Sequence, residues 1–100
     1  MDRERFLHKT AVVTGAGSEN GIGFAAARNL GLSGCRVAIT STTERIHQRV
    51  SELKALGIEA RGFVADLMER SQSDAMCEQI LSGLGPADIL EYKGPIESYH

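Results

Sequence analysis

The chain has 100 residues, of which 42% are hydrophobic, so it is expected to form one small globular domain. Its formal net charge of −2, without a basic block, argues against nucleic acid or an anionic membrane surface as a partner. No apolar run approaches the ~20 residues of a membrane span, and the opening MDRERFLHKT lacks the apolar core of a secretion signal. Cys35 and Cys77 lack metal-ligand spacing. We therefore expect a cytoplasmic protein with two buried free thiols and no metal site.

The first predicted strand, Thr10–Thr14, is apolar on both faces, as expected of a central parallel strand. A glycine-rich loop follows, and then a helix is predicted over about Ile22–Leu32. Strand, glycine loop and helix together hold a pyrophosphate, because glycines let the backbone approach it and the helix start favours negative charge. The alternative is that the glycines only form a tight turn and let the helix pack closely. The candidate phosphate ligands are Gly15, Gly17, Gly21, Ile22 and Gly23.

The second predicted strand, Arg36–Thr40, leads into Ser41–Glu44, which has the pattern of a helix capping box. In that motif the serine hydroxyl accepts from a backbone N–H three residues on, and the glutamate reaches back. The helix is predicted to run to about Leu56 and to end at Gly57. Its apolar stripe consists of Ile46, Val50, Leu53 and Leu56.

The third predicted strand, Glu59–Ala65, is weakened by Gly62, and a third helix is predicted over about Ser71–Leu84. A short fourth strand is predicted over Ala87–Leu90. The apolar side of the third helix is expected to carry Met76, Cys77, Ile80 and Leu84.

Strands that alternate with amphipathic helices predict the α/β class. We expect a Rossmann-like parallel sheet with helices on both faces, built from about four strands and three helices. Ligands in such sheets bind outside the carboxyl ends of the strands, where the glycine loop, Ser41–Arg45 and Asp66 lie. Residues 1–90 are interpreted as half of a dinucleotide-binding Rossmann domain, and residues 91–100 as a divergent tail.

Four motifs, taken in order, resemble the short-chain dehydrogenase/reductase family over roughly residues 8–90. They are Thr14-Gly15, Gly21-Ile22-Gly23, Ala65-Asp66-Leu67, and Gly85-Pro86-Ala87-Asp88-Ile89-Leu90. The best-fitting subgroup is the 3-oxoacyl-thioester (acyl-carrier-protein) reductases. The resemblance implies an NAD(P)-dependent oxidoreductase that transfers hydride between a carbonyl and an alcohol. It also implies the strand order 3-2-1-4 and a place for Asp66, with Leu67, beside the adenine amino group.

The sequence departs from the family in three places. Ala16–Asn20 makes the glycine loop longer than usual, and Gly17 is assigned to the extra turn. Glu91–Pro95 stands where the family has Asn-Asn-Ala-Gly. The family's catalytic Ser and Tyr-x-x-x-Lys are absent from these 100 residues, and the adjacent Tyr92 and Lys93 could not share a helix face. No catalytic residue is assigned.

The residue that ends the second strand selects the cofactor, because a carboxylate there bonds the ribose 2′-hydroxyl and repels a 2′-phosphate. Here the position is Ser41, followed by Thr42, and Arg45 could pair with a phosphate. Arg36 begins the strand and is too far away. NADP is therefore favoured over NAD. The alternatives are that Ser41 only caps the helix, that Arg45 is only solvated, and that Asp66 only caps its own turn.

Three interpretations of function stay open. The chain is the cofactor-binding portion of an oxidoreductase, incomplete for catalysis; or a non-catalytic dinucleotide-binding module; or an inert truncated or mis-spliced fragment, since the resemblance stops just after Leu90. The unpaired outer edge of the fourth strand predicts marginal stability, and it invites a second copy or a partner chain. No substrate is predicted.

Overall fold

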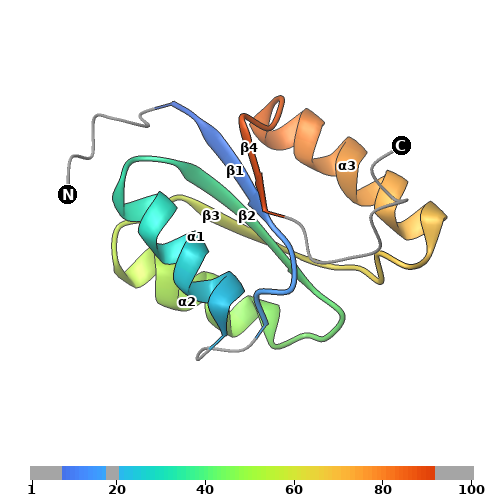
Figure 1. Cartoon of the computed structure of the whole chain (residues 1–100), viewed down its shortest axis with the longest axis horizontal. Helices are drawn as coiled ribbons and strands as arrows, with labels where there is room; N and C mark the ends of the chain where they lie inside the picture. The colour runs from blue at the N-terminus through green and yellow to red at the C-terminus, as the bar shows by residue number, and fades with distance from the viewer. Residues whose placement is uncertain (1–7, 18–20, 92–100) are drawn as a thin grey trace.

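The structure is a computed structural model that describes residues 8–17 and 21–91 (Figure 1). Strands and helices alternate along the chain, as the sequence predicted, and each boundary except the start of the second helix falls within two residues of the expected one. The elements are β1 (Thr10–Val13), α1 (Ile22–Leu32), β2 (Arg36–Ser41), α2 (Ile46–Ala55), β3 (Ala60–Val64), α3 (Arg70–Leu84) and β4 (Ile89–Glu91).

The four strands form one parallel sheet in the order β3-β2-β1-β4. In its register Val12 lies beside Ala38, and Ala38 lies beside Arg61. Helices α1 and α2 cover one face of the sheet and α3 covers the other (Figure 1). The predicted Rossmann-like fold and strand order are therefore confirmed.

The larger part of the core lies between the sheet and the α1–α2 layer. Because side chains alternate between the two faces of a strand, the odd-numbered residues of β1 and β2 point to this side. The helices contribute side chains that are wholly or almost wholly buried. This cluster includes Ala11, Val13, Val37, Ile39, Phe24, Ala27, Ile46 and Leu53.

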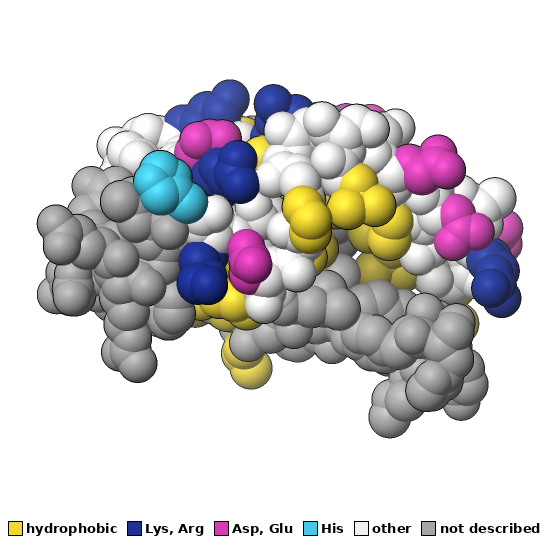
Figure 2. All heavy atoms as spheres, turned by 90° about the horizontal axis from the view of Figure 1, so that it is seen from above, with side chains coloured by type: hydrophobic (Ala, Val, Ile, Leu, Met, Phe, Trp, Pro, Cys, Tyr) yellow, Lys and Arg dark blue, Asp and Glu magenta, His cyan; other side chains and the backbone are white. Residues whose placement is uncertain are grey.

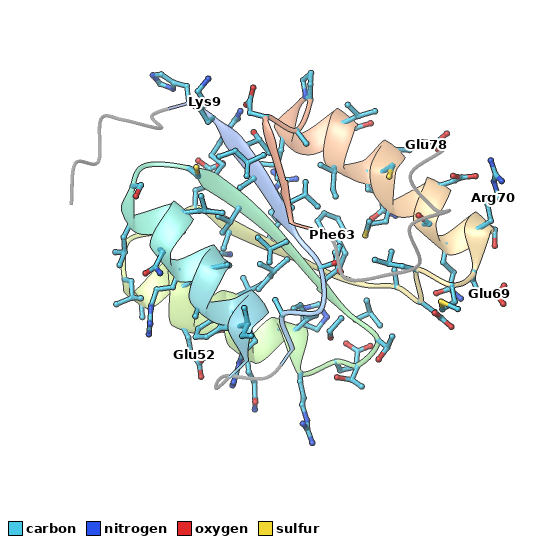
Figure 3. All side chains as sticks on the ribbon, viewed as in Figure 1. Lys9, Glu52, Phe63, Glu69, Arg70 and Glu78 are labelled. Carbon is cyan, nitrogen blue, oxygen red and sulfur yellow. The ribbon has the colours of Figure 1, made fainter. Side chains whose placement is uncertain are left out.

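The smaller cluster joins α3 to the other face of the sheet. Met76, Ile80 and Leu84 pack over Val12 and Ala38, and Phe63 lies between β3 and α3 whereas Glu78 and Arg70 lie on the outer side of that helix (Figure 3). The prediction that Cys77 belongs to the apolar side is wrong, because its thiol is exposed. The spacing of four residues aligns 76, 80 and 84, and residue 77 lies about 100° further around the helix.

The ends of α1 and α2 have the same geometry. After α2, Gly57 has a φ of +82°, its N–H donates to the Lys54 carbonyl at 2.9 Å, and the Ile58 N–H donates to the Leu53 carbonyl at 3.1 Å. This is a Schellman motif, which favours glycine because its left-handed backbone is strained for other residues. The predicted stop at Gly57 is confirmed, and Gly34 with a φ of +109° ends α1 in the same way.

The predicted capping box at Ser41–Glu44 is wrong. β2 extends through Ser41, and α2 begins only at Ile46, so the serine lies too far upstream to cap the helix. Its Oγ accepts from the Thr43 N–H at 3.2 Å and donates to the Thr43 carbonyl at 2.8 Å, which closes a local turn instead. The residue that precedes α2 is Arg45, which is already helical and makes no side-chain cap.

A polar network ties the elements together at the amino ends of the strands. The Thr10 N–H donates to Asp88 Oδ2 at 2.9 Å, Arg36 Nη2 donates to Thr10 Oγ1 at 3.0 Å, and Thr10 Oγ1 donates to the Leu84 carbonyl at 3.3 Å. Arg36 therefore lies at the edge opposite the predicted cofactor site. Burial, with the nearby Asp88 carboxylate, raises the pKa of the adjacent Cys35 thiol.

The described residues include no membrane-spanning helix. On the face drawn in Figure 2 there is no large patch of one charge. No helix in the part of the chain that the structure describes is long and apolar enough to cross a bilayer. Basic and acidic side chains are interspersed on the face in Figure 2.

Candidate functional site

Three loops converge at the carboxyl edge of the sheet and enclose a cavity of about 350 Å³. Each loop follows one strand, so parallel pairing brings distant stretches of sequence together there. Seven of the ten predicted site residues line this cavity: Gly15, Gly17, Ser41, Thr42, Arg45, Asp66 and Leu67. The walls also contain Thr40, Thr43, Ala65 and Met68, which were not among the ten predicted site residues. Each of them is adjacent in the sequence to a residue that was predicted.

The other three predicted residues, Gly21, Ile22 and Gly23, lie at the start of α1 and are not part of the cavity wall. Gly23 sets how closely this helix approaches the turn after β1. A Cβ atom at residue 23 would lie 2.8 Å from the Gly15 carbonyl oxygen and 3.2 Å from the Thr14 carbonyl oxygen. Only glycine permits this packing, so the close-packing interpretation of the glycines holds at this position.

The amino end of α1 has the features of an anion-binding helix start. Gly21 precedes the helix with an extended backbone and without a side-chain cap, and the first turn carries no acidic residue. The N–H groups of a first helical turn have no partner inside the helix, and the helix dipole is positive there. Gly15, with a φ of +68°, turns the chain beside this helix start.

Gly17 joins the glycine loop to the end of β2. A Cβ atom at this position would lie 2.9 Å from Ser41 Cβ and 3.1 Å from Ser41 Oγ. One residue earlier, the Ala16 N–H donates to the Thr40 carbonyl at 2.9 Å. Gly17 therefore serves a contact between two loops, in addition to the extra turn that the sequence analysis assigned to it.

The turn after β2 separates its charged side chains. Thr42, Thr43 and Arg45 are exposed and line the cavity. Glu44 lies outside the cavity wall, along a different groove, and its Oε2 lies 2.9 Å from His47 Nε2. Within the described residues, this turn thus supplies the cavity with hydroxyls and a guanidinium but with no carboxylate.

Asp66 organises the turn after β3. Its Oδ1 accepts from the Met68 N–H at 2.9 Å, and its backbone carbonyl accepts from the Glu69 N–H at 3.0 Å. Its own N–H donates to Gln72 Oε1 at 2.8 Å, which ties the turn to α3. The turn-capping role is therefore present, and it holds the carboxylate in the cavity wall.

Comparison with known proteins identifies the family from a stretch far longer than the glycine loop. Residues 9–96 match the family model described as short chain dehydrogenase. The chain belongs to the short-chain dehydrogenase family. The resemblance inferred from the four sequence motifs is thus confirmed at the level of the family.

Relatives of this short-chain dehydrogenase chain include curated proteins and solved structures. Tropinone reductase-like 3 of Erythroxylum coca is 37% identical over 91 residues, which are 90% of this chain and 34% of that protein. A metagenomic short-chain oxidoreductase in complex with NADP is 36% identical, with a TM-score of 0.78, over 85% of this chain and 38% of that one. A short-chain dehydrogenase/reductase from Burkholderia phymatum in complex with NAD is 31% identical, with a TM-score of 0.79, over 85% and 30%.

The chain therefore spans about a third of the length of these relatives. One of the two structures holds NADP and the other NAD, so family membership leaves the cofactor preference open. The subgroup of 3-oxoacyl-thioester reductases stays a prediction. Among the described residues, no group of three His, Cys, Asp or Glu side chains is arranged to hold a metal ion.

Proposed function

We propose that this chain is the NADP-binding portion of a short-chain dehydrogenase/reductase-type oxidoreductase. The observation that carries the proposal is the cavity at the carboxyl edge, where the glycine turn meets a hydroxyl- and arginine-bearing turn without a carboxylate. Bound cofactor would carry the hydride of the reaction: its reduced form would donate hydride to a carbonyl, and its oxidised form would accept hydride from an alcohol. The residues of this chain hold and orient the cofactor.

The pyrophosphate is assigned to the turn at Gly15 and the start of α1. Gly23 brings the first helical turn close to Gly15, and the absence of an acidic residue or a side-chain cap keeps this helix start suited to an anion. Gly17, Gly21 and Ile22 complete this part of the site. Both functions of the glycines, close packing and phosphate binding, apply at once.

The adenosine end is assigned to the turns after β2 and β3. The Ser41 hydroxyl is engaged with Thr43, so its role is to shape the turn. Thr42 and Arg45 are exposed at the cavity and are suited to donate hydrogen bonds to a 2′-phosphate. Asp66 and Leu67 are assigned to the adenine.

These 100 residues alone are proposed to bind the cofactor without turnover. Proton transfer to a carbonyl needs a positioned acid, and the Tyr-x-x-x-Lys pair that the family uses does not occur in this sequence. Carbonyl reduction, with 3-oxoacyl thioesters as the first substrate class to test, is a proposal for a protein that also carries that pair. A non-catalytic dinucleotide-binding module is the second candidate, and its binding site is the same.

Isothermal titration calorimetry of the 100-residue chain tests the proposal. NADPH and adenosine 2′,5′-bisphosphate should bind saturably, and NADPH should bind about tenfold more tightly than NADH, the value of one or two charge-assisted hydrogen bonds. Equal affinity for NADPH and NADH would remove the NADP preference. No binding, together with a non-cooperative unfolding transition, would favour the inert-fragment interpretation.

A further inference from the structure

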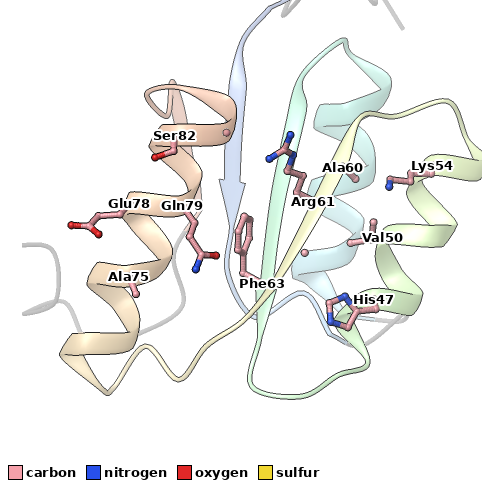
Figure 4. Close-up of a pocket in the computed structure, with 12 residues that line it drawn as sticks. His47, Val50, Lys54, Ala60, Arg61, Phe63, Ala75, Glu78, Gln79 and Ser82 are labelled. Atoms are coloured by element: carbon pink, nitrogen blue, oxygen red, sulfur yellow. The ribbon is translucent and has the colours of Figure 1, made fainter.

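A large cavity lies apart from the proposed cofactor site. It is a groove of about 820 Å³ lined by α2, β3 and α3, and a second groove of about 380 Å³ continues it past Phe63 and Val64. Since α2 and α3 cover opposite faces of the sheet, a groove that contacts both must run along the outer edge of β3. Figure 4 shows β3 between the two helices, with His47, Val50 and Lys54 of α2 on one side of it.

The floor of the groove is a row of main-chain groups without partners in the described part of the chain. The Val37 N–H donates to the Glu59 carbonyl and the Ala65 N–H donates to the Ser41 carbonyl, both at 2.9 Å. The main-chain N–H and C=O groups of the odd-numbered residues of this strand therefore point toward β2. Because successive residues of a strand direct their main-chain groups to opposite sides, the N–H and C=O groups of Ala60, Gly62 and Val64 face the groove.

Features that usually protect an edge strand from pairing are weak here. β3 contains no proline, and Val64 is apolar and 43% exposed. Its one charged residue, Arg61, lies against Gly83 of α3, where a Cβ atom would clash with the guanidinium. The absence of a side chain at Gly83 therefore leaves room on α3 for the Arg61 guanidinium.

We propose that two copies of this chain pair through β3, antiparallel, about a two-fold axis at Gly62. Gly62 would then face its own copy, and Ala60 would face Val64 of the partner subunit, each pair exchanging two hydrogen bonds. The two sheets become one, and the exposed Val64 side chain is covered.

The charges along α2 match this arrangement. Lys54 lines the groove beside Ala60, and Glu44 lines its continuation beside Val64. A two-fold axis perpendicular to the sheet keeps both on the same face but reverses the direction of the groove. The amine of each copy therefore meets the carboxylate of the other.

Sedimentation equilibrium at low ionic strength, where ion pairs are least screened, tests the proposal without depending on the cofactor. The wild-type chain should form a discrete dimer. Lys54→Glu and Glu44→Lys should each loosen it about tenfold, because two symmetry-related attractions become repulsions. The double variant Lys54→Glu/Glu44→Lys should restore the wild-type dimer, and Arg28→Glu on α1, which makes the same charge change away from the groove, should leave it unchanged.

A second variant addresses the main chain. Val64→Pro removes an N–H that points into the groove and that makes no bond to β2, so it should abolish the dimer while the circular dichroism spectrum stays that of the wild type. A wild-type monomer at about 100 µM, or aggregates without a defined dimer, would overturn the proposal. A double variant whose dimer dissociates as readily as those of the single variants would also overturn it.

Discussion

Gly23→Ala is the sharpest test of how the glycine loop works. The added Cβ atom would lie 2.8 Å from the Gly15 carbonyl oxygen and 3.2 Å from both the Gly15 carbonyl carbon and the Thr14 carbonyl oxygen. All three are backbone atoms, which cannot rotate away, so α1 must move outward by about 0.5 Å to reach a normal contact. Overpacking of this kind costs about 1–3 kcal/mol, whereas the better helix propensity of alanine returns at most about 1 kcal/mol.

The expected result is a net loss of about 1–2 kcal/mol in the free energy of unfolding, measured by urea denaturation. NADPH affinity should fall about tenfold, because the displaced helix start no longer matches the Gly15 turn. Gly83→Ala is the matched control: its new Cβ meets only the flexible end of Arg61, so it should be neutral or stabilising by up to about 1 kcal/mol. A Gly23→Ala chain as stable and as tightly binding as the wild type would refute the packing argument.

Two further variants and two measurements on the cysteines probe separate parts of the molecule. Arg45→Glu should weaken NADPH about tenfold in calorimetry and leave NADH within twofold, since only the 2′-phosphate would contact this side chain. Leu53→Ala, at a fully buried site, should cost about 2–5 kcal/mol in urea denaturation, a loss that a marginally stable chain would show as unfolding. Cys77 should react with a thiol reagent in the native state and Cys35 only after unfolding. Because the folded pKa of Cys35 is raised above its usual 9.0, stability should fall as the pH rises past 9.0.

The order of the elements could be predicted because it depends on local patterns. The apolar run of β1, the stripe of α2 and the glycine after it each occupy a short stretch and act within it. The same patterns place the carboxyl ends of the strands at one edge, so most of the residues that line the proposed cofactor cavity could be named from the sequence. Gly57 is the clearest example: one residue ends the helix, and the same residue can be recognised as a helix end in the sequence.

The predictions failed where a local sequence pattern was compatible with a second local hydrogen bond, or where the decisive contact joins residues that are far apart in the sequence. Ser41 and Glu44 match a capping box, but a serine can equally close a turn with the residue two positions on, and the length of β2 decided the outcome. The contact of Gly17 with Ser41 joins loops 24 residues apart in the sequence. No period or motif indicates such a contact before the strands are paired.

The turn after β2 connects the two surfaces proposed here. A glutamate immediately before an arginine would ordinarily weaken a phosphate site, because the carboxylate repels the same ligand that the guanidinium attracts. In this turn Glu44 faces the groove along β3 and bonds to His47, whereas Arg45 lines the cofactor cavity. The Ser41–Thr43 hydrogen bonds fix the path of the chain that separates them. The proposed preference for a 2′-phosphate therefore depends on the conformation of the turn as much as on its composition. Ser41→Ala should reduce this preference without removing any group that is proposed to contact the phosphate.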